Sequence, residues 1–258
     1  MASSSSSSSV KQHGREFSLM EIKSATNNFS GKHEMAEGGF GKVYRGFIDN
    51  QQTMVAVKLL NKASIETPTG FHVKIATLSP IHHRNIVSLI GYCKEEDEMI
   101  FVYEYIANHT LEDHLHRLLK DGHSELSWNE RLTILIGVAR AFCHLQYFIC
   151  GGSFKQYRGV KSSNILLDDN FVANVSLDDL HSHVSTTDIG MFHPYYCLYK
   201  SLTRDSDTYS FGVMVLEVLS GRWEVDNRRP LEERILPSWA LYREAREILD
   251  PVFHGNLS

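Results

Sequence analysis

Residues Gln156 to Asp169 read Q-Y-R-G-V-K-S-S-N-I-L-L-D-D, and they decide how the rest of the chain is interpreted. A basic and polar segment ends at Asn164, and the short apolar run Ile165-Leu166-Leu167 follows it directly. Such a run is typical of a buried strand. Gly159 lies within the polar segment and has no side chain that could accept a proton.

This stretch resembles the catalytic loop of eukaryotic protein kinases, whose core reads His-Arg-Asp-x-Lys-x-x-Asn before a short strand. It matches at Arg158, Lys161 and Asn164, and it departs at Tyr157 and Gly159. In the family, the residue at the position of Gly159 is the aspartate that accepts the proton of the substrate hydroxyl. The resemblance therefore implies a kinase fold without its catalytic base.

A glycine-rich segment at 35–46, M-A-E-G-G-F-G-K-V-Y-R-G, precedes the strand-like run Met54–Leu60. A glycine turn between two strands lets backbone N–H groups approach a phosphate closely. With V-A-V-K at 55–58, it resembles the kinase glycine-rich loop and strand lysine, although Ala36 replaces the first glycine. The resemblance implies a nucleotide-binding set of Ala36, Gly38, Gly41, Val43, Ala56, Lys58, Tyr103, Glu104, Ile106 and Leu166.

The segment Gly70–Tyr92 resembles the αC helix and the next strand of plant receptor-like kinases. In that family a glutamate pairs with the strand lysine, and Lys74 occupies its position. Two ammonium groups about 4 Å apart repel by about 1 kcal/mol in water and by more at a lower effective dielectric. We therefore expect no activating ion pair, and we expect Lys58 to be displaced from Lys74.

Met99–Ile106 reads as a buried strand that enters a hinge. By resemblance Tyr103 is the gatekeeper, and the backbone of Glu104 and Ile106 would meet adenine. Thr110 is expected to open a short helix. Ser127-Trp128-Asn129-Glu130 is a capping box, and the apolar face of the long helix after it is predicted at Leu132, Leu135, Val138 and Phe142.

Directly after the stretch 156–169, residues 171–180 resemble the strand that in kinases leads into the motif Asp-Phe-Gly. Leu177 stands at the aspartate position, and leucine cannot bind a hard cation such as magnesium. Asp178 is an alternative, shifted ligand, although its position in the family belongs to an inward-packed phenylalanine. Residues 206–222 resemble the central helix of the C-lobe, in which Asp207 would brace the catalytic loop. The resemblance also implies that the chain stops before the last two helices of that lobe.

Composition and charge argue against binding to nucleic acid or to an anionic membrane, and against a membrane span. The chain has 258 residues and a net charge of -5, which favours neither nucleic acid nor an anionic membrane. No apolar run approaches the ~18 residues of a membrane span. The four cysteines form no C-x-x-C motif and no secretory signal precedes them, so a reducing cytoplasm is expected.

Two further hypotheses concern the segment after Leu177. Residues 185–187, Ser-Thr-Thr, could be phosphorylated and then pair with Arg158. The simpler interpretation is that Arg158 is a structural arginine on a solvated loop, because exposed ion pairs contribute little. The other hypothesis is a zinc site. Its ligands would be His181, His183, His193 and Cys197, but the spacing of these residues fits no compact zinc-ligand pattern.

The predicted organisation has three parts. Residues 1–15 are serine-rich and expected to be disordered, and residues 16–33 form a helical lead-in that begins with the capping box Ser18-x-x-Glu21. Residues 34–258 form an α+β, bilobal protein-kinase-like domain with its N-lobe at 34–103, hinge at 104–107 and a truncated C-lobe at 108–258. The apolar positions of the lead-in helix are Leu19, Ile22, Ala25 and Phe29.

The family resemblance points to plant receptor-like and receptor-like cytoplasmic kinases of the malectin-receptor (FERONIA-like) type. Phosphoryl transfer needs a base, a held metal and placed phosphates, and Gly159, Leu177 and Lys74 supply none of these functions. Lys58, Lys161 and Asn164 are present and belong to the catalytic set. A general base alone is worth ~10²–10⁴-fold in rate.

The expected function is therefore that of a pseudokinase. It would be a cytoplasmic scaffold or decoy that binds an active receptor-like kinase or an immune receptor, and such a partner could recruit it to the plasma membrane. ATP binding stays open and magnesium binding is not expected. The alternatives are a weakly active serine/threonine kinase and a degenerate copy without function.

Overall fold

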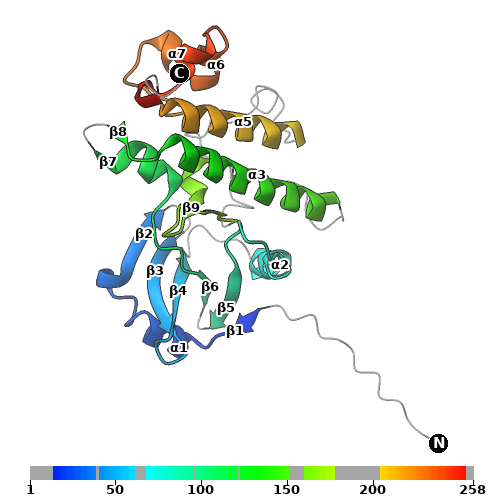
Figure 1. The fold of residues 1–258 in the computed structure, drawn as a ribbon. Coiled ribbons are helices and arrows are strands. Elements are labelled where there is room, and N and C mark those ends of the chain that lie inside the picture. Colours follow the sequence, from blue (N-terminus) through cyan, green and yellow to red (C-terminus); the bar gives the residue numbers. More distant parts are fainter. Residues whose placement is uncertain are drawn as a thin grey trace, which may run out of the picture. The chain divides into compact units, whose positions relative to one another are not determined.

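The computed structural model describes residues 14–38, 41–61, 68–95, 97–120, 123–150, 160–177 and 204–253 (Figure 1). The chain divides into two compact units. One consists of Met1–His82 and Ser88–Tyr105, and the other of His83–Val87 and Ile106–Ser258. The break at Tyr105 falls inside the predicted hinge. Residues 83–87, however, were predicted to belong to the N-lobe and instead group with the second unit.

The first unit is built mainly of strands. Its elements are β1 (Arg15–Glu16), α1 (Leu19–Ala25), η1 (Gly31–His33), β2 (Glu34–Gly38), β3 (Gly41–Ile48), β4 (Thr53–Leu60), α2 (Pro68–Leu78), β5 (Leu89–Glu95) and β6 (Glu98–Glu104).

The strands form one six-stranded sheet in the order β1-β5-β6-β4-β3-β2. β1 pairs with β5 in parallel, and the other neighbours are antiparallel. Because side chains alternate across a strand, the sheet has two distinct faces. Val57 and its register partner Val102 lie on one face, and Lys58 and its partner Phe101 lie on the other.

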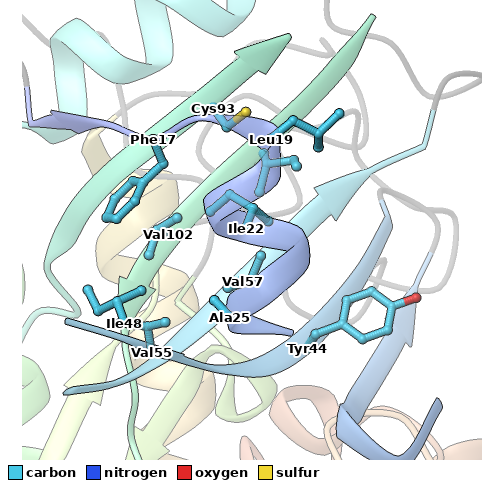
Figure 2. Close-up of a cluster of buried hydrophobic side chains, with 11 residues drawn as sticks. Phe17, Leu19, Ile22, Ala25, Tyr44, Ile48, Val55, Val57, Cys93 and Val102 are labelled. Atoms are coloured by element: carbon cyan, nitrogen blue, oxygen red, sulfur yellow. The ribbon is translucent and has the colours of Figure 1, made fainter. Parts of the chain in front are cut away.

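Helix α1 covers the first of these faces. Figure 2 shows its apolar residues against those of the strands, and Ile22 is completely buried. The lead-in therefore shares the core of the first unit rather than forming a separate segment. The cluster consists of Phe17, Leu19, Ile22, Ala25, Tyr44, Ile48, Val55, Val57, Cys93, Ile100 and Val102.

The capping box that begins α1 is confirmed. The Ser18 hydroxyl accepts from the Glu21 N–H at 3.2 Å, and the Glu21 carboxylate accepts from the Ser18 N–H at 2.8 Å. Two details of the lead-in were predicted wrongly. Arg15 is paired in β1 instead of belonging to a disordered terminus. Phe29 lies beyond the helix with a φ of 53°, and its ring packs edge-on against Tyr44.

The second unit is mainly helical. Its elements are η3 (Asp113–Arg117), β7 (Leu119–Lys120), β8 (His123–Ser124), α3 (Trp128–Cys150), η4 (Ser162–Asn164), β9 (Ile165–Leu167), β10 (Ala173–Val175), α5 (Arg204–Ser220), η6 (Leu231–Glu233), α6 (Leu236–Ala240), α7 (Ala245–Ile248) and η7 (Pro251–Phe253).

Helices α3 and α5 contact each other and form the centre of this unit (Figure 1). The predicted capping box at the start of α3 is confirmed, because Ser127 and Glu130 each accept the other's backbone N–H. The predicted apolar face is wrong at Leu132, which is 36% exposed. The helix instead buries Arg131, because its guanidinium has polar partners inside the unit.

Candidate functional site

Five of the nucleotide-binding residues predicted in the first unit lie on one face of its sheet. Ala36 is the register partner of Val43, Val43 of Lys58, and Ala56 of Tyr103. Because register partners point to the same side of a sheet, all five side chains share the face opposite α1. The fold thus brings together residues that are up to 67 positions apart (103 − 36).

The glycine-rich turn joins β2 to β3. Gly38 and Gly41 are register partners at its base. Gly41 has a φ of +146°, and a Cβ there would lie 2.1 Å from the Leu59 carbonyl oxygen. Only glycine allows this approach of the β3 and β4 backbones.

Lys74 lies in helix α2, on the buried side of the helix. Lys74 is 4% exposed, and Phe71 and Ile75 are buried beside it. Its Nζ lies 5.3 Å from the centre of the Phe101 ring, within range of a cation–π interaction. An aromatic ring thus faces this ammonium group.

Lys58 approaches the same ring, because Phe101 is its register partner on β6. Lys58 is 7% exposed. Phe101 is thus the register partner of Lys58 and also the ring that faces the Lys74 ammonium group. That position 74 is the one where the family has a carboxylate stays a prediction. Whether Lys58 is displaced from Lys74 remains a prediction.

The end of β6 enters the predicted hinge. Glu104 is tied to Ser88 twice: its backbone N–H donates to the Ser88 carbonyl at 3.1 Å, and its carboxylate accepts the Ser88 N–H at 2.6 Å. Tyr103 is buried and Ile106 is half-buried. Ile106 is the residue at which the chain passes from the first unit into the second. Their roles in binding adenine stay predictions.

In the second unit, the turn η4 leads into a hairpin of β9 and β10. Leu166 pairs with Asn174, and the Ser176 N–H donates to the Asn164 carbonyl at 2.8 Å. Asn164 and Leu177 therefore lie at the same end of the hairpin. Leu177 is 2% exposed, so the residue that the resemblance assigns to the metal-ligand position is apolar and buried; that assignment stays a prediction.

The turn η4 also has a support that the sequence reading missed. The Ser162 hydroxyl donates to Glu217 Oε1 at 2.9 Å, and His116 Nε2 lies 2.8 Å from the same oxygen. Burial raises the pKa of Glu217 to about 8 and lowers the pKa of His116 to about 4. The signal available in the sequence was a lone glutamate within the apolar run V-M-V-L-E-V-L of α5.

Several predicted site residues lie outside the described residues, and their predictions stay open: Tyr157, Arg158, Gly159, Asp178, His181, His183, residues 185–187, His193 and Cys197. Asp207 is described and buried. Within the described ranges, no cluster of three or more His, Cys, Asp and Glu side chains could bind a metal ion. In the same ranges no helix is both long and apolar enough to cross a bilayer.

Comparison with known proteins agrees with this arrangement. Residues 29–233 match the family model described as protein tyrosine and serine/threonine kinase. The chain is 43% identical over 257 residues to the putative receptor-like protein kinase At5g39000 and 41% identical over 260 residues to the receptor-like protein kinase FERONIA, both from Arabidopsis thaliana. It is 38% identical over 255 residues to the probable serine/threonine-protein kinase PBL23 of the same plant.

These matches cover 95%, 95% and 93% of this chain, in that order, but only 29%, 28% and 66% of the three relatives. The chain thus spans less than a third of the two receptor-like kinases and just under two thirds of the third relative. The family match extends over both units, from the end of the lead-in to η6. The chain therefore belongs to the protein tyrosine and serine/threonine kinase family, within the group of plant receptor-like kinases.

Proposed function

We propose that this chain is a pseudokinase that acts by binding another protein. The observation that supports this most is the burial of Leu177, the residue that the resemblance assigns to the magnesium-ligand position; its neighbour Ser176 is hydrogen-bonded to Asn164. Magnesium requires oxygen ligands in near-octahedral geometry. Among the described residues at this end of the hairpin, the leucine side chain of Leu177 offers no oxygen ligand to a magnesium ion.

Two further positions support the proposal. Gly159 cannot accept a proton from a substrate hydroxyl, and Lys74 places an ammonium group instead of a carboxylate next to Phe101, the register partner of Lys58. ATP is still compatible with the first unit, because Val43 and Ala56 present apolar side chains on the same sheet face as Lys58. We propose that any ATP binding is independent of magnesium.

A phosphotransfer assay with radiolabelled ATP tests the missing chemistry. The unmodified protein should transfer no phosphate, and the repair variant Gly159→Asp/Leu177→Asp/Lys74→Glu should gain activity that Lys58→Ala removes again. Thermal melting shows whether each variant is folded. Self-labelling by the unmodified protein that Lys58→Ala abolishes would refute the proposal and favour the weakly active kinase.

Nucleotide binding is tested separately by thermal shift with ATP, with and without magnesium. The expected result is the same stabilisation in both conditions, since a ligand that binds only the native state raises its stability. No shift at millimolar ATP would exclude the nucleotide part of the proposal.

The proposed partner is an active receptor-like kinase or an immune receptor, which would place the chain in the cytoplasm at the plasma membrane. Binding of purified active receptor-like kinase domains to the immobilised chain tests this idea. Binding that Lys58→Ala leaves unchanged is expected of a scaffold. Absence of micromolar binding to any kinase domain of the group, or to an immune receptor, would argue for a degenerate copy.

A further inference from the structure

A buried polar cluster lies below the turn that carries Lys161 and Asn164. It joins His116 of η3, Glu217 of α5 and Ser162 of η4. The side chains of His116 and Glu217 are 2% and 0% exposed. Three separate elements of the second unit therefore meet at one carboxyl group.

The geometry requires a hydrogen atom between His116 and Glu217, because the distance from Nε2 to Oε1 is 2.8 Å. The His116 ring is also stacked on Trp223, with ring centres 3.9 Å apart and planes 17° apart. This stack limits how far the imidazole can move. The hydrogen lies either on the ring nitrogen or on the carboxyl oxygen.

The second carboxyl oxygen of Glu217 decides between these states. Oε2 is buried and has no hydrogen-bond donor among the described residues. An ionised carboxylate would leave a charged oxygen without solvation, which is far less favourable than leaving a carbonyl oxygen unpaired. The hydrogen is therefore on Glu217, and His116 Nε2 accepts it. Its neutral ring then carries its own proton on Nδ1.

Charged groups from neighbouring elements surround the pair and act in both directions. Glu112 and Glu224 raise the pKa of His116, while Arg117 and Arg131 lower it, and burial dominates all four effects. Burial also dominates for Glu217, whose pKa Glu112 raises further and the Ser162 hydrogen bond lowers. The surroundings thus favour a neutral acid and a neutral imidazole.

We propose that Glu217 and His116 form a proton-sharing support that positions the turn carrying Lys161 and Asn164, and that loss of the shared proton loosens this turn. Glu217 acts through Ser162, so it is a positioning residue. When Glu217 ionises, its proton goes to solvent, the imidazole proton moves from Nδ1 to Nε2, and Nε2–H then donates to the carboxylate. This inference does not depend on phosphotransfer, ATP or a partner.

Nuclear magnetic resonance of the full chain with isotope-labelled histidine tests the proton position directly. His116 should show the Nδ1–H tautomer at pH 6.5 and change to the Nε2–H tautomer with a midpoint near pH 8. His116→Phe, which keeps an aromatic ring against Trp223, assigns the signal. A single tautomer of His116 from pH 6 to 9.5, or a protonated ring at pH 6.5, would overturn the proposal.

Amide hydrogen exchange at Asn164 and Ile165, corrected for the intrinsic pH dependence, tests the effect on the turn. Opening exposes Glu217 and His116 to water, where their pKa values return to about 4.5 and 6.5. At pH 6.5 the ring of His116 is half protonated in the open form, and at pH 8 Glu217 is half ionised in the closed form. Over this range the open form therefore binds on average fewer protons than the closed form, by less than one. Its population should rise about 8-fold from pH 6.5 to 8 and level off at higher pH.

Three variants separate positioning from general stability. Glu217→Gln should abolish the 8-fold rise, while Ser162→Ala should lower protection at every pH and leave the tautomer change of His116 intact. Ser163→Ala is the matched control in the same turn and should change neither. If Glu217→Gln does not fold, Ser162→Ala and Ser163→Ala still decide: equal protection in both would refute the positioning role.

Discussion

The buried ion pair between Arg131 and Asp250 offers a sharp test of how the second unit is held together. Arg131 is completely buried and donates to the Asp250 carboxylate at 2.8 Å and to the Val218 carbonyl at 2.7 Å. Its guanidinium also lies 4.6 Å from the centre of the Phe253 ring. Asp250 thus ties the end of the described chain to α3.

The change Asp250→Ala removes the counter-charge and leaves the guanidinium in the interior. Loss of one partner of such a pair typically costs about 3–5 kcal/mol. Asp250→Asn keeps an oxygen acceptor and should cost less, because charged hydrogen bonds contribute roughly 1.5–3 kcal/mol. The exposed pair of Arg117 and Asp113 is the control, since Arg117→Ala should cost less than about 1 kcal/mol.

Urea unfolding followed by tryptophan fluorescence measures this effect in the second unit alone. All three tryptophans, Trp128, Trp223 and Trp239, belong to that unit. With a slope of about 2 kcal/mol per molar urea, Asp250→Ala should lower the midpoint by roughly 2 M. A loss below about 1 kcal/mol, similar to that of Arg117→Ala, would refute the argument that the pair is essential in the interior.

Three other predictions follow from the same structure. Gly91→Ala should release β1, because the added Cβ would lie 2.0 Å from the Arg15 carbonyl oxygen, and limited proteolysis near Arg15 should become faster; unchanged cleavage would contradict the strand pairing. Ile22→Ala should destabilise the first unit by about 2–5 kcal/mol, because it leaves a cavity in the core. Hydrogen exchange of the β4 amides measures this loss. Met20→Ala is the control and should have little effect, because the Met20 side chain is 80% exposed. The second unit should lose roughly 1.2 kcal/mol between pH 6.5 and 8, because folded Glu217 keeps a proton that the unfolded chain has released, and the partly protonated His116 of the unfolded chain offsets only part of this effect; Glu217→Gln should remove the loss in urea titrations.

Much of the fold could be predicted because the informative signals are local. The capping boxes at Ser18 and Ser127 depend on residues three positions apart, and both are found. The errors arise where distant contacts override a local pattern. Leu132 fits the apolar spacing of α3 but is exposed, since the buried position goes to Arg131, whose partners Val218 and Asp250 lie far along the chain.

In the candidate site, too, the sequence determined some features and the tertiary structure determined others. The sequence alone determined which chemical groups exist at the motif positions: a glycine at 159, a leucine at 177 and a lysine at 74 are facts of composition, independent of folding. Family membership followed from the order and spacing of those motifs. No arrangement of the backbone can give Gly159 a side chain that accepts a proton.

Only the tertiary structure decided the surroundings of these groups. It placed the Lys74 ammonium against Phe101, buried Leu177 beside Asn164, and joined Glu217 to His116 and Ser162 across three elements. Residues 116 and 217 are separated by 101 positions. The energy of a buried proton depends on burial and on neighbours that only packing brings together, so the apolar run around Glu217 could indicate a buried carboxyl group but not its partners His116 and Ser162.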